Sequence, residues 1–436
     1  MIATTIISIT TFVLILLSLF LFPKVTIGKV SFATYWAIAL LGAAILLVFS
    51  LAPIDEVWNQ LITDKAINPI KILVLFFSMT SISIFLDEFG LFQYLASIAV
   101  KVAKNNQYVL FFSLYVLVAL LTIFTSNDIV ILTLTPFIVF FCKRANINPL
   151  PYLIAEFTAA NTWSLMLIIG NPTNIFLATS AGIDFIDYFK VMAIPTLCAG
   201  LVEVLILFLL FRNKLSEKIT EIDAEKVKIN SKSLLIIGIV HLVVCLVFLV
   251  ISSYINVEMW LVCLICALSL FLCTFVELLF THKNWNYIHD VAKRMPYSLI
   301  PFFLSMFVVV VALNYQGIAS EISKFFGENN VIWVYGYTSL VSSNIINNIP
   351  MSILYANLAS GLSGLSYRSA IFASIIGSNI GAFLTPMGAL AGIMFTNLLN
   401  KYEVKFSFVD FVKYGVVVAV PVITVALAML SVTISY

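Results

Sequence analysis

Two short polar segments lie inside long apolar runs of this chain. The first is Thr125-Ser126-Asn127-Asp128, and the second runs from Ser343-Asn344 through Asn347-Asn348-Ile349-Pro350. Both bring amides and hydroxyls to membrane depth, and the first also brings a carboxylate. A charged side chain at the centre of a bilayer costs about 2.5–3.5 kcal/mol on insertion scales, so a carboxylate kept there indicates a function. We interpret both segments as tips of paired binding elements.

The composition predicts the surroundings of these tips. The 436 residues are 62% hydrophobic and only 10% charged, and the mean hydropathy is +1.10. Soluble domains carry about 25% charged residues, so the chain is expected to be a multi-pass protein of the cell membrane, with the lipid bilayer as its solvent. The net charge of +2 and the lack of a basic run exclude a nucleic-acid partner.

Short apolar arms predict that both tips belong to re-entrant hairpins. Residues 107–124 and 129–142 flank the first tip, and the second arm has about 14 residues before Lys143, against the roughly 20 that a crossing needs. A second hairpin is expected over residues 331–362, with Asn347-Asn348 at its turn.

Two further segments predict broken helices. Gly170-Asn171-Pro172-Thr173-Asn174 interrupts the apolar run 149–182, and the segment from Gly377 to Gly388 contains Thr385-Pro386. Proline removes a backbone donor and clashes with the preceding turn, and glycine tolerates unusual backbone angles. A helix broken at membrane depth is stable only when it is buried in protein or lines a cavity.

A short internal match predicts a duplication. Phe185-Ile-Asp-Tyr-Phe-Lys190 recurs as Phe408-Val-Asp-Phe-Val-Lys413, each before a closing span. We place repeat 1 within about residues 70–212 and repeat 2 within about residues 297–434.

The predicted fold is an all-α polytopic membrane protein with two inverted repeats. It has about ten transmembrane helices plus two re-entrant hairpins and two broken helices. Lysines and Arg212 make the central linker cytoplasmic, so the hairpins enter from opposite faces. The expected parts are an N-terminal membrane half (1–212), a linker (213–232) and a C-terminal half (233–436).

Hairpin tips and helix breaks together predict a substrate site near the midplane. The exposed N–H groups and positive dipole ends of half-helices suit an anion or an oxygen-rich neutral solute. No Lys or Arg is expected at that depth, so a multiply charged substrate would depend on dipoles and a co-bound cation. The candidate substrate ligands are Asn127, Asn161, Asn171, Thr173, Asn174, Asn347, Asn348, Asn379 and Thr385.

Two carboxylates are candidates for the coupling ion. Asp128 binds H⁺ or Na⁺ or caps the second hairpin arm, and both roles can hold together, since an aspartate at a helix start is a good N-cap. Glu156 lies within an apolar run and either binds a cation or lies near the headgroups. No cofactor and no metal cluster is expected beyond the coupling H⁺ or Na⁺.

The polar segments resemble one family. Phe124–Asp128 through Pro136, Ser343–Pro350 and Ile376–Gly388 are similar, in this order and over nearly the whole chain, to ArsB-type arsenite/antimonite permeases. These belong to an ion-transporter superfamily with NhaD-type Na⁺/H⁺ antiporters and citrate or dicarboxylate carriers. The chain departs from the ArsB pattern at Asn379, often Asp, and at Met351, usually Thr; Gly170–Asn174 is closer to the anion carriers.

The resemblance implies a secondary active transporter. The first hypothesis is proton-coupled efflux of arsenite or antimonite, because As(III) at neutral pH is chiefly an uncharged trihydroxide that suits an amide-and-hydroxyl site. The alternatives are a Na⁺- or H⁺-coupled carrier of citrate, dicarboxylate or another small anion, and a Na⁺/H⁺ antiporter. An enzyme is not expected, since the sequence has no HExxH motif. A homodimer stays open, and so does a separate ATPase subunit, because the chain has no P-loop.

Overall fold

The structure is a bundle of helices with one small β-hairpin. The computed structural model describes residues 1–22, 24–27, 30–62, 68–104, 106–216, 229–281 and 286–435. The hairpin pairs β1 (Lys24–Ile27) with β2 (Val30–Ala33) antiparallel, Val25 opposite Phe32. It is an exception to the all-α prediction, at a segment whose β-branched residues favour strands. Parts of the charged segments used to predict orientation, including Lys29, Asp64, Lys218, Lys226, Lys228 and Lys283, lie outside the described residues.

The N-terminal half begins with two apolar helices and a short third one. From α4 onward it contains a long helix, a short amphipathic helix, a helical hairpin, a broken helix and a second long helix. These elements are α1 (Ile2–Leu21), α2 (Thr34–Val48), α3 (Ile54–Ile62), α4 (Pro69–Glu88), α5 (Leu91–Ala103), α6 (Gln107–Phe124), α7 (Asn127–Ala145), α8 (Leu150–Trp163), the 3₁₀ turn η1 (Ile168–Gly170), α9 (Pro172–Ser180), α10 (Phe185–Phe211) and η2 (Lys214–Ser216).

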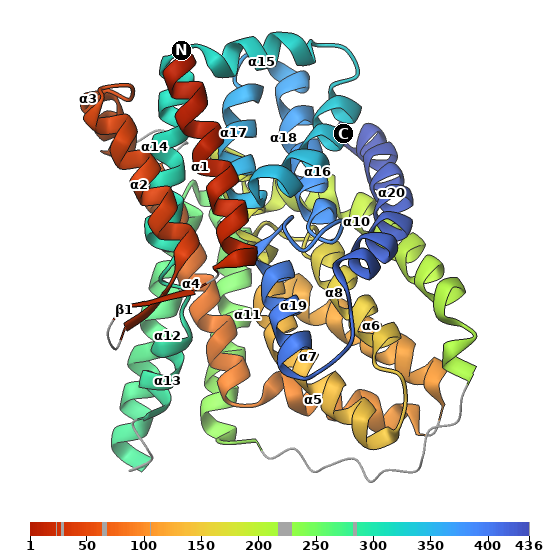
Figure 1. The fold of residues 1–436 in the computed structure, drawn as a ribbon. Coiled ribbons are helices and arrows are strands. Elements are labelled where there is room, and N and C mark those ends of the chain that lie inside the picture. Colours follow the sequence, from red (N-terminus) through yellow and green to blue (C-terminus); the bar gives the residue numbers. More distant parts are fainter. Residues whose placement is uncertain are drawn as a thin grey trace.

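The C-terminal half repeats this order of helix types: α14–α20 correspond in order to α4–α10. Its elements are α11 (Lys232–Ile255), α12 (Met259–Thr281), α13 (Asn286–Arg294), α14 (Leu299–Tyr315), α15 (Ile318–Phe326), α16 (Val331–Ile346), α17 (Asn348–Ala359), α18 (Gly364–Gly381), α19 (Leu390–Lys401) and α20 (Phe408–Thr433). The short helices α5 and α15 lie at opposite ends of the bundle (Figure 1).

Helix lengths agree with only part of the predicted topology. Within the described residues, seven helical segments are long and apolar enough to span a membrane: α4, α6, α10, α11, α12, residues 286–315 and α20. Of the ten expected crossings, six are among these segments, α1 contributes an apolar run described over residues 2–18, α2 is a shorter apolar helix, and two are the broken helices.

The predicted length of the second arm of the first hairpin, about 14 residues, was too short. Helix α7 has 19 residues because it starts at Asn127 and continues through Lys143 to Ala145. Helix α6 has 18 residues. The re-entrant hairpin stays a prediction; the tip between α6 and α7 contacts the end of α8, through Asn127 and Asn161.

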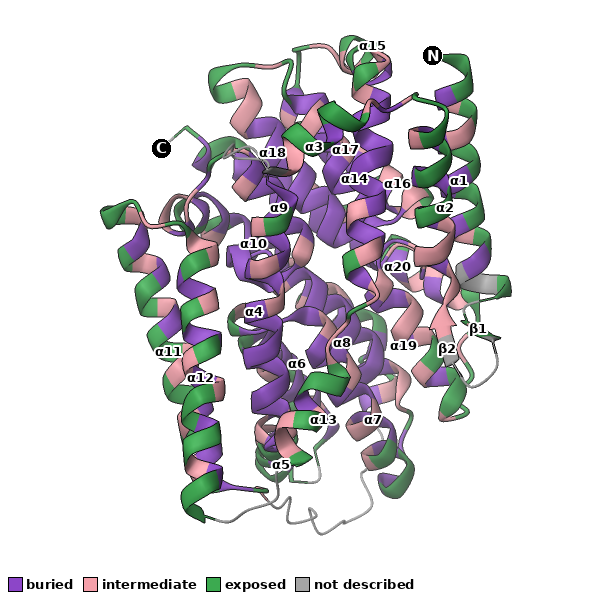
Figure 2. Ribbon diagram, turned by 90° about the vertical axis from the view of Figure 1, so that its left-hand side faces the viewer, coloured by how far each residue is buried: buried purple, intermediate pink, exposed green. Residues whose placement is uncertain are grey.

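The interior holds the hairpins and broken helices, and longer apolar helices surround them. In Figure 2, α11 and α12 stand at one side and α1 at the other, with exposed residues on their outer faces. Many of these exposed residues are large and apolar, including Val247 of α11 and Leu272 of α12, as expected for a lipid-facing surface.

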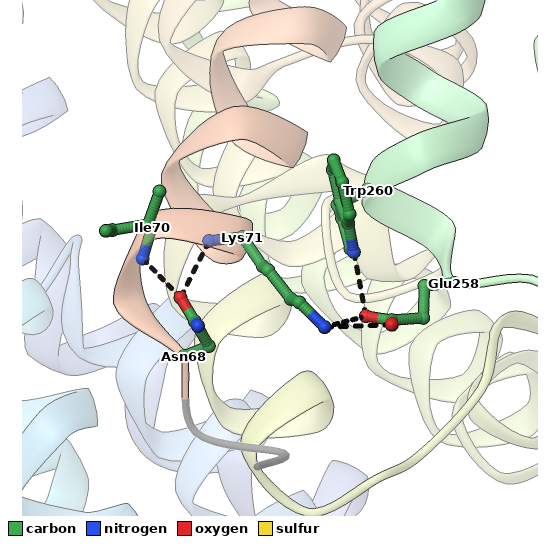
Figure 3. Close-up of polar contacts among 5 residues, drawn as sticks. All are labelled: Asn68, Ile70, Lys71, Glu258 and Trp260. Atoms are coloured by element: carbon green, nitrogen blue, oxygen red, sulfur yellow. Dashed lines mark hydrogen bonds and ion pairs between the residues drawn. The ribbon is translucent and has the colours of Figure 1, made fainter. Parts of the chain in front are cut away.

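Helix α4 is fixed at both ends by ion pairs. At its start, Asn68 accepts hydrogen bonds from the backbone of the first turn, and Lys71 Nζ lies 2.7 Å from Glu258 Oε2 beside Trp260 (Figure 3). At its end, Arg294 of α13 pairs with Asp87 and, at 3.0 Å, with Glu88. Helix α4 is therefore tied to α12 near one end of the bundle and to α13 near the other.

Candidate substrate site

The tip of the first hairpin contacts the end of α8. Ser126 is the N-cap of α7, and Asn127 is its first residue. Asn127 Nδ2 donates to Asn161 Oδ1 at 3.2 Å, and Asn161 Nδ2 donates to Phe157 O of its own helix at 2.8 Å. Asn127 Oδ1 is buried and has no hydrogen-bond donor among the described residues. The tip therefore brings one unsatisfied acceptor to the break that follows α8.

Asn379 joins the two broken helices to each other. Its Oδ1 accepts from Ser164 Oγ at 2.8 Å and from Asn171 Nδ2 at 2.9 Å. Its Nδ2 donates to Asn174 Oδ1 at 2.6 Å and to Ile375 O at 2.9 Å. Because Asn379 is 0% exposed and uses both ends of its amide, it connects the two halves of the chain at their centre.

Hydroxyls extend this network along the first turn of α9. Asn171 caps that helix, since its Oδ1 accepts from Thr173 N at 3.1 Å and from Thr173 Oγ1 at 3.0 Å. Ser378 Oγ of α18 donates to Thr173 Oγ1 at 3.2 Å. All three side chains are buried. The start of α9, whose backbone N–H groups bond to Asn171, thus faces the second half of the chain.

The tip of the second hairpin contacts the second break through backbone groups. Asn347 Nδ2 donates to Met387 O at 3.1 Å, and Asn348 N donates to Gly388 O at 3.1 Å. Asn347 has φ +69°, a conformation that asparagine tolerates better than most residues. The side chain of Asn348 is buried, and no described residue hydrogen-bonds to its side-chain amide.

Thr385 and Asn344 complete that second contact. Thr385 Oγ1 donates to Asn344 Oδ1 at 2.6 Å, and Asn344 Nδ2 donates to Gly381 O at 2.9 Å. Asn344 was not among the predicted ligands. Its signal was present in the sequence, because it lies in the same polar tip as Asn347.

A cavity of about 430 Å³ opens beside the first tip. Asp128 lines it, together with the cationic side chains of Lys24, Arg294 and Lys401. Among the described residues no group hydrogen-bonds to the Asp128 carboxylate. The alternative of a capping role for Asp128 is therefore wrong, because Ser126 occupies the cap position. The sequence predicted a site without Lys or Arg. Three such residues line this cavity, so the prediction is corrected for the surroundings of Asp128.

Glu156 lies apart from the amide network. It is 1% exposed, and both its oxygens accept from Thr135 Oγ1, at 3.0 and 3.1 Å. Thr135 is about two helical turns beyond Asp128 on α7. Glu156 is therefore a carboxyl buried inside the protein, between α8 and α7.

A third intramembrane carboxyl, Glu203 of α10, was missed. It is 0% exposed, inside a 27-residue apolar helix. The rule that drew attention to Asp128, a lone acid within an apolar run, applies to it equally.

The chain matches a known family of membrane transporters. The family model described as "Citrate transporter" (CitMHS) matches residues 12–377. The chain belongs to the CitMHS family. A CitMHS protein is a membrane transporter and not an enzyme, as predicted, and this one is a multi-pass protein.

Relatives of this CitMHS protein include membrane proteins with other names. It is 26% identical over 418 residues to an "Arsenical pump membrane protein" of Escherichia coli strain K12, covering 91% of this chain and 93% of the relative. It is 26% identical over 408 residues to a "46 kDa membrane protein" of Mycobacterium leprae, covering 89% and 91%. These relatives confirm the resemblance to the arsenical permeases.

The fold also matches a solved structure. The crystal structure of the YdaH transporter of Alcanivorax borkumensis covers 99% of this chain and 98% of its own, with a TM-score of 0.56 and 14% identity. At that identity the likeness shows the fold alone.

Proposed function

We propose that this CitMHS protein is a secondary active transporter that exports arsenite or antimonite in exchange for protons. The observation that carries the proposal is the buried network of neutral donors and acceptors around Asn379, next to a cavity with one carboxylate. A trihydroxide such as As(OH)₃ both donates and accepts, and so do amides and hydroxyls. The substrate ligands proposed are those of the two hairpin tips and two breaks.

Asp128 is the proposed coupling group. It is the second residue of α7, where the helix dipole stabilises a negative charge by about 0.3–1 kcal/mol. Because it faces the cavity without a partner, it can exchange a proton with cavity water. Bound substrate at Asn127, the adjacent residue, would change the space and hydration around it. Glu156 is a second candidate, and the single hydroxyl of Thr135 lies within hydrogen-bond distance of both its oxygens.

The halves of the chain are proposed to be inverted repeats. The helix order of α4–α10 recurs in α14–α20, and α5 and α15 lie at opposite ends of the bundle (Figure 1). Inverted repeats with broken helices place the substrate between them, near the bilayer midplane. This agrees with the contact between the two breaks.

A second candidate function rests on the cavity rim. Lys24 and Lys401 line the cavity with two cationic side chains, and Arg294, which also lines it, is paired with Asp87 and Glu88. The two lysines against the single Asp128 carboxylate favour an anion such as citrate. The description of the family model supports the same alternative.

Uptake into everted membrane vesicles separates these functions. With an imposed proton gradient we expect accumulation of As(III) that collapses with the gradient. Accumulation of citrate with indifference to As(III) would overturn arsenite export, and Na⁺ movement alone would favour antiport.

The role of Asp128 is tested in the same vesicles. Asp128→Asn is expected to insert normally and to lose gradient-driven accumulation, because an amide cannot carry the proton. Wild-type coupling in that variant would refute the role.

A further inference from the structure

The middle of α10 carries a carboxylic acid that the proposed mechanism does not use. Glu203 lies inside the apolar helix Phe185–Phe211, about 12 Å along the axis from Phe211 at 1.5 Å per residue. Its side chain is fully buried. Neither oxygen of the carboxyl has a hydrogen-bond partner in the described part of the chain.

Two threonines of α8 face this carboxyl. Thr158 and Thr162, one helical turn apart, lie close to Glu203, although neither forms a well-aligned hydrogen bond to it. The Thr158 hydroxyl donates to Ile154 O at 3.0 Å, whereas Thr162 Oγ1 has no partner among the described residues. A buried polar group left unpaired costs about 1–3 kcal/mol. The interface of α8 and α10 thus holds two unsatisfied polar groups facing each other.

Aromatic side chains close this interface on one side. Tyr115 OH of α6 donates to Gly200 O of α10 at 2.8 Å, and Trp163 Nε1 of α8 donates to Tyr115 OH at 3.1 Å. A Cβ on Gly200 would lie 2.4 Å from Trp163 Cζ2, so the indole packs directly on the backbone of α10. Three helices therefore meet one turn before Glu203 without supplying a cation.

No opposite charge compensates Glu203 among the described residues of the helices packed against α10. Tyr115 is the ionisable side chain that faces it from α6. Helix α8 contributes the two threonines, and its Glu156 contacts Thr135 of α7. The ionisable residues of α20 (Asp410, Lys413 and Tyr414) lie in its first two turns, where Tyr414 packs on Phe211, and residues 415–433 include none. Of the ionisable side chains of α11, Lys232 and Tyr254 lie at its two ends. His241 contacts Ser269 of α12, and Cys245 contacts Met79 of α4. An isolated carboxylate is strongly disfavoured in such surroundings, so this site accommodates the neutral acid.

The position of Glu203 connects it to the substrate site. Thr162 directly follows Asn161, whose side chain accepts from Asn127 at the hairpin tip. A movement of α8 that alters the tip contact must also alter the surroundings of Glu203.

We propose that Glu203 is a second proton-carrying group of this transporter. It holds one proton as the neutral acid in this conformation. When α8 and α10 rearrange and water reaches the site, the O–H bond breaks, the proton passes to water, and the carboxylate later takes a proton from the other side. The inference rests on the proton coupling proposed above, but Glu203 lies outside the cavity of Asp128.

Infrared spectroscopy tests the proton on Glu203 without any substrate. Full-length protein in liposomes is titrated between about pH 5 and pH 9, and the carboxylic acid C=O band of Glu203→Gln is subtracted from that of the wild type. We expect a difference band that is strong at low pH and weakens as the pH rises. No difference band, or one that does not change with pH, overturns the proposal, because a merely structural acid would stay protonated.

Transport in everted vesicles tests the coupling, with As(III) as the probe. Glu203→Gln is expected to keep As(III) exchange at equal pH and to lower gradient-driven accumulation at least about fivefold, the range of a typical coupling factor. Glu203→Asp keeps a carboxyl and should keep a pH-dependent rate, with its profile shifted along the pH axis from that of the wild type. The control is Glu277→Gln, which alters a partly exposed glutamate near the end of α12.

The outcomes separate this proposal from the proposed function. Wild-type accumulation in Glu203→Gln refutes the coupling role of Glu203. If the wild type moves no As(III), arsenite export fails while the infrared titration still decides on Glu203. If Glu203→Gln does not insert, the pH response of Glu203→Asp decides, and a profile identical to the wild type counts against the proposal.

Discussion

Replacing Asn379 by alanine should loosen the contact between the two halves of the chain. The side chain makes three hydrogen bonds to other elements, with Ser164, Asn171 and Asn174. Side-chain hydrogen bonds in membrane proteins average about 0.6 kcal/mol and reach about 1.7 kcal/mol. Three such bonds give an expected loss of about 2 kcal/mol in the free energy of unfolding, with a ceiling of about 5 kcal/mol.

Thermal unfolding of the detergent-solubilised protein measures this loss. Asn213→Ala is the matched control, because Asn213 is exposed and a surface change of this kind stays within about 0.5 kcal/mol. We also expect Asn379→Ala to lose As(III) transport, since Asn171 and Asn174 would be free to turn away from the break. A variant as stable as Asn213→Ala and fully active would refute the reasoning that Asn379 holds the two breaks together.

Substituting aspartate at this position distinguishes geometry from charge. A carboxylate cannot donate to Asn174 Oδ1, 2.6 Å from the present amide nitrogen, whereas the protonated acid can. Asn379→Asp should therefore be less stable at high pH than at low pH. A stability that does not depend on pH would show that the Asn379–Asn174 bond is unimportant.

Two further substitutions test the packing and the ion pairs. Gly377→Ala should lower the free energy of unfolding by about 1–3 kcal/mol, because the new Cβ would lie 2.0 Å from Ser339 Oγ and 2.2 Å from Gly336 O, a backbone atom that cannot turn aside. Gly361→Ala is its control, with 3.4 Å to the nearest atom, and equal melting temperatures for the two would contradict the prediction. Arg294→Ala should cost about 1–3 kcal/mol by leaving the buried Asp87 carboxylate unpaired, and Arg294→Lys should recover part of that cost. Chemical unfolding compares the wild type with Arg294→Ala and Arg294→Lys. If Arg294→Ala is as stable as the wild type, water solvates the Asp87 carboxylate in place of the arginine.

Much of the fold could be predicted because the signals were local. Pro172 and Pro386, each next to polar residues within an apolar run, marked both breaks, and apolar run lengths located the long helices. The β-hairpin at Lys24–Ala33 could not be predicted from run length, since its residues look like the start of a span. The arm length of α7 was underestimated because Lys143 and Arg144 were taken as its end, although long basic side chains continue a helix well.

The site was predicted as a set of residues and not as a set of contacts. Pattern alone indicated that Asn161, Asn171 and Asn379 lie at breaks, but not that Asn379 accepts from Asn171 across the two halves. The cationic side chains that line the cavity could not be predicted either, because Lys24, Arg294 and Lys401 come from three distant segments of the chain. Such a meeting depends on how whole helices pack, which no local signal encodes.

The contact between the two breaks has a consequence for motion. Since Asn379 and Ser378 of α18 bond to Asn171, Asn174 and Thr173 around the start of α9, these two helix ends cannot slide independently without losing several hydrogen bonds at once. A cheaper displacement carries α9 and α18 together as one block, past α4, on which α9 packs. The ion pairs that hold α4 to α12 and α13 would then act as the stationary frame against which that block travels.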